Sequence, residues 1–179
     1  MRGRSNVAGA RIQAKVKRTT LLYRTLLLFT FSGIGGLIFQ IIWTRKLGLF
    51  LGSTIQSASL ITANFLLGLS LGALVAGERG SKLKNPLKQF ARLEFGVAAS
   101  GLLTTYLIPR LHQAASLVAD PETGFYRVVA ILLASLLVLV PSLMMGATLP
   151  LLTEYSSRTT TFAKALALLY AVNTLGAAL

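Results

Sequence analysis

The chain has 179 residues, 54% of them hydrophobic, with a mean hydropathy of +0.68 and a formal net charge of +13. A soluble domain does not tolerate this apolar composition, so most side chains must face lipid or other helices. With no cysteine and only one histidine, His112, the sequence excludes a disulfide framework, a thiolate nucleophile and a histidine-rich metal centre. The basic residues lie between apolar runs, which favours anionic lipid headgroups over nucleic acid as their partner.

Residues 1–20 form a basic segment that contains no acidic residue. The first apolar run, residues 21–43, would be about 35 Å long as a helix, enough to cross a hydrocarbon core of roughly 30 Å. Arg24 lies within a turn of its basic end, and Trp43 should lie at the opposite membrane interface. A transit peptide is an alternative for the basic start, whereas a cleaved signal peptide is disfavoured because basic residues follow the run.

Four more apolar runs predict four further membrane-spanning helices. They cover residues 54–76, 87–109, 128–150 and 162–179. The last would be about 28 Å long, barely a full crossing. Pro141 should kink its helix and leave the carbonyl of Leu137 without a helical donor. In the longest connection we expect a short surface helix at residues 111–119 and a turn at residues 120–124.

The distribution of lysine and arginine predicts the orientation. With the N-terminus inside, fourteen of these residues fall in inner segments and four in outer loops, a strong bias by the positive-inside rule. The predicted fold is therefore an all-α polytopic bundle of about five transmembrane helices at residues 21–179. We expect a cytoplasmic N-terminal segment and a multi-pass protein of the cell inner membrane.

Glu94 is the one ionisable residue well inside an apolar run, where a charge costs roughly 2.5 kcal/mol or more unless it is paired or used. It could form an ion pair with Lys88 or Arg92 that fixes the neighbouring loop, or it could be a cation or proton site. Three carboxamides also fall at membrane depth: Gln40, Asn64 and Asn173. Each could hydrogen-bond between helices or line a substrate cavity. A carrier requires that all four side chains face one cavity.

Small residues predict where helices approach closely. The candidate packing positions are Gly68, Gly72, Gly146 and Gly176. Gly68 and Gly72 are four residues apart and share a helical face. The sequence contains no Walker loop, strand-led dinucleotide motif or nucleophile elbow, so it offers no catalytic, cofactor-binding or metal-binding residue.

A series of short phrases runs from Ser32 to the end of the chain. They are SG at 32–33, LIFQ at 37–40, WTR at 43–45, GST at 52–54, LGLSLG at 67–72, LE at 93–94, MGATLP at 145–150 and YAVNTLGAA at 170–178. In order and spacing they resemble the membrane-spanning part of multi-span spermidine-synthase-like proteins. The spans also resemble, more loosely, the opening helices of major-facilitator carriers.

In the spermidine-synthase-like family, the spans precede a soluble domain of methyltransferase type that transfers an aminopropyl group from decarboxylated S-adenosylmethionine to a diamine. The nucleotide-binding motif and catalytic aspartates of that domain have no counterpart in this sequence, so no catalytic residue carries over. The resemblance therefore implies a fragment, a truncated product or a short relative that keeps only the helices.

Three function hypotheses follow. The first is a non-catalytic membrane module that acts as anchor, docking or structural subunit of a membrane complex. Its partners would be anionic lipid headgroups and other membrane subunits or a synthase domain, without cofactors or nucleic acid. The second is the front end of a membrane-bound aminopropyltransferase (spermidine synthase), and the third is part of a polyamine or small-solute carrier.

Overall fold

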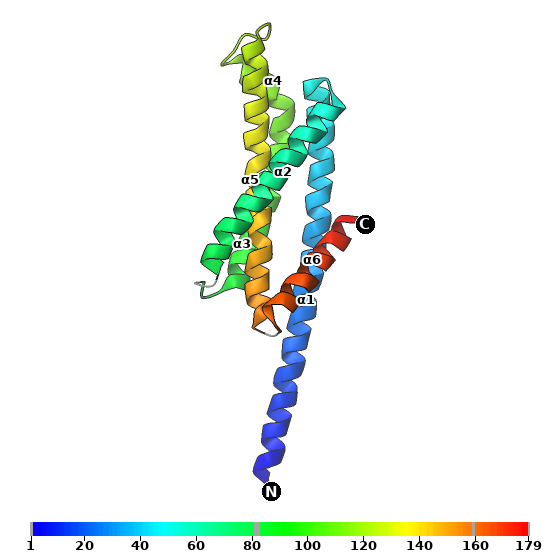
Figure 1. The fold of residues 1–179 in the computed structure, drawn as a ribbon, viewed down its shortest axis with the longest axis vertical. Coiled ribbons are helices and arrows are strands. Elements are labelled where there is room, and N and C mark those ends of the chain that lie inside the picture. The colour runs from blue at the N-terminus through cyan, green and yellow to red at the C-terminus, as the bar shows by residue number, and fades with distance from the viewer. Residues whose placement is uncertain (1, 81–82, 159, 179) are drawn as a thin grey trace.

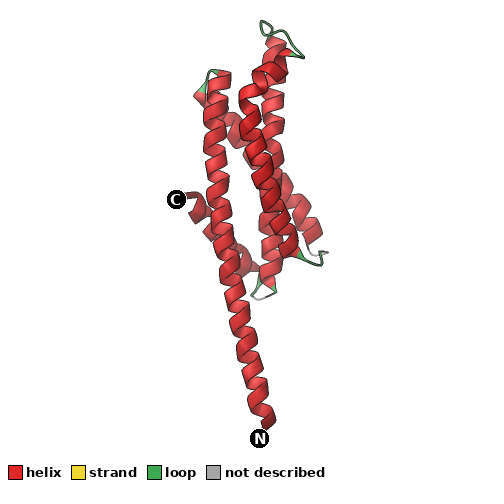
Figure 2. Cartoon of the chain, turned by 180° about the vertical axis from the view of Figure 1, so that it is seen from behind, coloured by secondary structure: helices red, strands yellow, loops and turns green. Residues whose placement is uncertain are grey.

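The computed structural model describes residues 2–80, 83–158 and 160–178. Within these ranges every regular element is helical and no strand occurs (Figures 1 and 2). The elements are α1 (Arg2–Leu51), α2 (Thr54–Gly80), α3 (Pro86–Leu107), the 3-10 turn η1 (Ile108–Arg110), α4 (Leu111–Ser116), α5 (Gly124–Ser157) and α6 (Phe162–Ala178). The predicted all-α class is confirmed for these residues.

Helix α5 is the centre of the bundle, and it packs against α2, α3, α4 and α6. Helix α1 runs along the whole length of the bundle, and α6 crosses it obliquely (Figure 1). The connections gather at two ends. The turn after α1 and the α4–α5 connection share one end, whereas the α2–α3 and α5–α6 connections share the other.

Three of the described helices are long and apolar enough to cross a membrane, which indicates a membrane protein. They are residues Thr19–Leu51 of α1, all of α2 and all of α5. The other two predicted spans do not meet both the length and the apolarity that a crossing requires. Helix α3 carries Lys88, Arg92 and Glu94, which lower its hydropathy, and α6 has 17 residues, or about 26 Å.

Helices α1, α2 and α5 continue past the apolar runs from which they are predicted. Helix α1 reaches Leu51, so Arg45 and Lys46, which follow the predicted span of residues 21–43, lie on the same helix. The chain reverses at Gly52, whose φ of 67° favours glycine. Helix α2 includes Glu78 and Arg79, which follow the predicted span of residues 54–76.

The helix that contains the predicted 128–150 span is α5, which begins at Gly124 and ends at Ser157. The hydroxyl of Thr123 caps its N-terminus by accepting a hydrogen bond from the amide of Tyr126 at 3.3 Å. Thr123 belongs to the expected turn, in which its hydroxyl also donates to the carbonyl of Asp120 at 2.6 Å.

Helix α5 continues without interruption through Pro141. Because proline has no amide hydrogen, the carbonyl of Leu137 loses its helical donor, as the sequence predicts. The hydroxyl of Thr104 in α3 donates to this carbonyl at 2.8 Å. Thr104 is only 3% exposed, so this bond both satisfies the carbonyl and fixes α3 against α5.

The sequence predicts Trp43 at the membrane interface, but its side chain does not face lipid. Its side chain is fully buried in the core cluster with Leu47, Ile61 and Val138. The indole nitrogen donates to the hydroxyl of Thr105 at 3.0 Å, so its one polar atom is satisfied inside the bundle.

Candidate functional site

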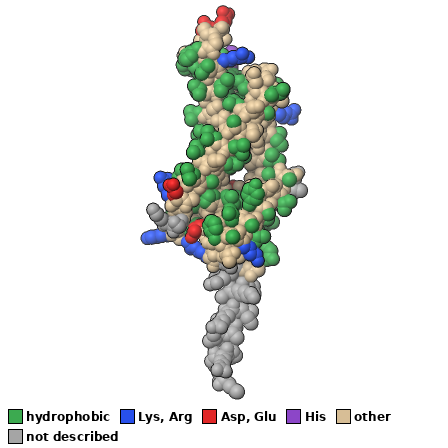
Figure 3. Space-filling view, viewed as in Figure 1, with side chains coloured by type: hydrophobic (Ala, Val, Ile, Leu, Met, Phe, Trp, Pro, Cys, Tyr) green, Lys and Arg blue, Asp and Glu red, His purple; other side chains and the backbone are tan. Residues whose placement is uncertain are grey.

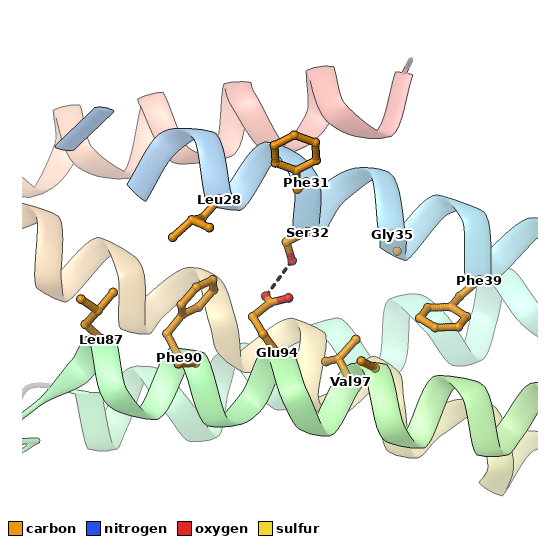
Figure 4. A pocket seen from close by; sticks show the side chains of 12 residues that line it. Leu28, Phe31, Ser32, Gly35, Phe39, Leu87, Phe90, Glu94 and Val97 are labelled. Atoms are coloured by element: carbon orange, nitrogen blue, oxygen red, sulfur yellow. Dashed lines mark hydrogen bonds between the residues drawn. The ribbon is translucent and has the colours of Figure 1, made fainter. Parts of the chain in front are cut away.

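Glu94 and Ser32 meet across α1 and α3. The Ser32 hydroxyl donates to Oε1 of Glu94 at 2.7 Å, and the two side chains point toward one another (Figure 4). Glu94 lies eight residues after the start of α3, which places it about 12 Å along the helix axis. The carboxyl group is half-buried between the two helices.

An apolar groove of about 570 Å³, the α1–α3 groove, surrounds this pair. Leu28, Phe31 and Phe39 contribute from α1, and Phe90 and Val97 from α3 (Figure 4). Glu94 and Ser32 supply its two polar side chains. An apolar site with one convergent polar group can bind a ligand that carries a complementary group.

The expected ion pair of Glu94 with Lys88 or Arg92 does not form. The Arg92 guanidinium is instead 3.5 Å from Oε1 of Gln89 on its own helix. Among the residues that the structure describes, the Ser32 hydroxyl is the one side-chain hydrogen-bond partner of Glu94, and no Lys or Arg forms a salt bridge with it. Lys88 and Arg92 point elsewhere because they fall on other sides of α3 from Glu94.

Gln40 and Asn173 line a second cavity of about 380 Å³, which shares Ser32 and Gly36 with the α1–α3 groove. It is enclosed by α1, α2, α5 and α6, and Ser32 lines both spaces. Neither carboxamide makes a side-chain hydrogen bond to another residue in the described part of the chain. These two predicted polar residues are therefore brought together, away from Glu94.

Asn64 lies apart from both spaces. Its amide nitrogen donates to the carbonyl of Leu60 at 2.8 Å and to the hydroxyl of Ser135 at 3.2 Å. It thus connects α2 to α5 as an interhelical contact. The four polar candidates do not share one cavity.

The predicted glycines lie where helices approach most closely. A Cβ at Gly68 would clash with the Cβ of Ser142, and one at Gly72 with the carbonyl of Leu143. On the facing helix α5, a Cβ at Gly146 would clash with the backbone of Leu69 in α2. Gly176 approaches α1 in the same way, at the carbonyl of Thr30.

Sequence reasoning missed three further close approaches. Gly33 faces the backbone of Asn173, Gly96 faces the side chain of Met144, and Gly101 lies under the ring of Phe39. A signal existed only for Gly33, which lies in a glycine-rich stretch with Gly35 and Gly36. Gly35, two residues later, differs from all of them, because a Cβ there would meet no atom within 4 Å.

The described residues contain no group of three or more His, Asp or Glu side chains that could hold a metal ion. The site offers one carboxyl group and one hydroxyl, inside an apolar surface, to a ligand or to another helix. No protein-family model, curated protein or solved structure matches this chain. The resemblance to spermidine-synthase-like proteins therefore stays a hypothesis that rests on the short sequence phrases.

Proposed function

We propose that this chain is a non-catalytic membrane module that docks another subunit of a membrane complex. The observation that carries the proposal is the α1–α3 groove, which the chain's own helices leave uncovered. Gly35 faces open space, while Leu28 and Phe31 keep 52% and 62% of their surface exposed beside it. Exposed apolar side chains of a membrane protein also face lipid, so the distinguishing feature is the polar pair of Ser32 and Glu94 inside the hollow, which is typical of a binding site.

We further propose that α3 and α6 join the three longer helices as membrane spans, which gives five, and that the N-terminus is cytoplasmic in the cell inner membrane. Charge placement supports this orientation. Lys and Arg gather at both ends of the bundle, with hydrophobic side chains between them (Figure 3). Arg79, Lys84, Lys88 and Arg158 belong to the end where α2 finishes and α6 begins, the same end as the N-terminus.

A docking role accounts for the polar residues better than a carrier role. A transport path needs polar groups that line one continuous passage through the bundle. Asn64 is engaged between α2 and α5, and Glu94 lines a different cavity from the two other carboxamides. This division favours contacts between helices over a path.

A small-solute site is the second candidate, and one observation favours it. Gln40 and Asn173 face the 380 Å³ cavity, where a hydrogen-bonding solute or water could satisfy them. Replacing Gln40 with Leu would abolish uptake or binding of such a solute. If the same variant loses only its association with another subunit, the cavity serves packing.

Gentle detergent extraction of native membranes, followed by native mass spectrometry, tests the docking function. We expect this chain inside a larger assembly that contains at least one other membrane protein. A chain that runs alone, or only with copies of itself, under conditions that preserve known complexes would contradict the proposal.

A further inference from the structure

The shape of the α1–α3 groove fits one helix. Its α1 wall runs from Leu28 to Phe39 and its α3 wall from Leu87 to Ala98, each about 16 Å or three helical turns long. Small side chains lie on both walls, with Gly35 on α1 and Ala98 on α3. Small residues let a neighbouring backbone approach closely in a membrane, where packing contributes much of helix association.

The chemistry of the groove points to a basic group on that helix. Glu94 lies near the middle of the α3 wall, and only its Oε1 atom is engaged, by Ser32. No cation of the described chain reaches the carboxyl group. An acidic side chain at membrane depth is stable when it pairs with an opposite charge or with hydrogen-bond donors.

We propose that the α1–α3 groove seats a transmembrane helix of another subunit, and that this helix carries a lysine or arginine that pairs with Glu94. The inference rests on the proposed docking function and specifies its partner. The groove positions the incoming helix by its three-turn length, and the ion pair fixes its depth. A partner with a serine or leucine at that depth would bind less tightly.

A second copy of this chain is a weaker match, and the crosslinking below distinguishes it. The basic residues on its described apolar helices lie within about two turns of a helix end or of the start of an apolar stretch, as Arg24, Arg92 and Lys164 illustrate. A lipid headgroup is a poor match for a different reason. Glu94 lies about 12 Å inside α3, whereas headgroup amines remain at the interface.

Site-specific photo-crosslinking in native membranes tests the proposal. A photo-reactive phenylalanine analogue replaces Phe31 in the groove or, as a control, Leu74 on α2. The two positions are equally exposed, at 62% and 61%. We expect the Phe31 position to crosslink to a transmembrane segment of another protein with a Lys or Arg within one turn of the adduct. Adducts confined to lipid, to a second copy, or to a segment without a basic residue would overturn the proposal.

Glu94→Gln supplies the second arm, with Glu78→Gln as the matched control on the end of α2. Glutamine can still accept the Ser32 hydrogen bond, so the fold should survive, which a melting curve checks. We expect Glu94→Gln to lower the Phe31 crosslink yield at least tenfold, while Glu78→Gln leaves it unchanged. Glu94→Lys combined with Lys→Glu or Arg→Glu in the partner should restore the yield.

The two proposals fail differently. If the groove crosslinks to another subunit but Glu94→Gln changes the yield less than twofold, the ion pair is wrong and docking stands. If no protein adduct forms from the Phe31 position in wild-type membranes, the docking function fails as well.

Discussion

Two helix interfaces of this molecule are built in opposite ways. Between α2 and α5, Gly68, Gly72 and Gly146 interlock so closely that an added Cβ would meet the backbone or the Cβ of the other helix. Between α1 and α3, Gly35 faces open space and a 570 Å³ groove remains. The same residue type therefore closes one interface and leaves the other accessible, and local sequence alone does not distinguish the two uses.

The largest effect should come from Gly146→Leu, which breaks the closed interface. The new side chain would force α5 away from the backbone of Leu69 and cost about 1–3 kcal/mol or more. A thermal melt in detergent should show a large drop in the midpoint or no folded protein. Retention of the wild-type midpoint would contradict the close approach of α2 and α5.

Thr104→Val should have an intermediate effect, because it removes the hydroxyl that satisfies the carbonyl of Leu137. We expect a loss of about 1 kcal/mol in unfolding free energy, between the average of about 0.6 and the maximum of about 1.7 kcal/mol for interhelical hydrogen bonds in a membrane. Pro141→Ala restores an amide donor to that carbonyl, so Thr104→Val should cost less in this background. Strictly additive effects in the double-mutant cycle would exclude the coupling.

Asn64→Leu should have the smallest effect on the closed interface. It removes the hydrogen bond to Ser135 at 3.2 Å but keeps the apolar volume, so we expect a loss of about 0.6 kcal/mol. Urea or detergent titration of the folded protein measures this difference. A loss of transport without a change in stability would instead assign Asn64 to a solute path.

The sequence predicted the helices well because each apolar run is long enough to be recognised by length alone. It predicted their ends poorly, since α1 and α5 continue into polar residues that a hydropathy window excludes. It also could not pair Glu94 with Ser32, which lies 62 residues earlier in the chain. The nearby Lys88 and Arg92 are the obvious partners from sequence, but they lie on other sides of α3 from Glu94.

Trp43 is a second residue whose partner lies too far along the chain to be identified from local sequence. A tryptophan at the end of an apolar run is typical of a membrane interface, yet this one is fully buried. Its donor is satisfied by Thr105, also 62 residues distant. Rules based on local sequence place such a side chain correctly only when no distant residue offers a partner.

The most direct test of the account compares Gly35→Leu with Gly77→Leu. A Cβ would meet no atom within 4 Å at either glycine, so neither variant should lose stability, but only Gly35 lies in the α1–α3 groove. We predict that gentle extraction recovers Gly77→Leu in the same assembly as the wild type, and that Gly35→Leu is folded but separated from its partner. If both variants remain in the assembly with unchanged mass, the α1–α3 groove is not the docking site.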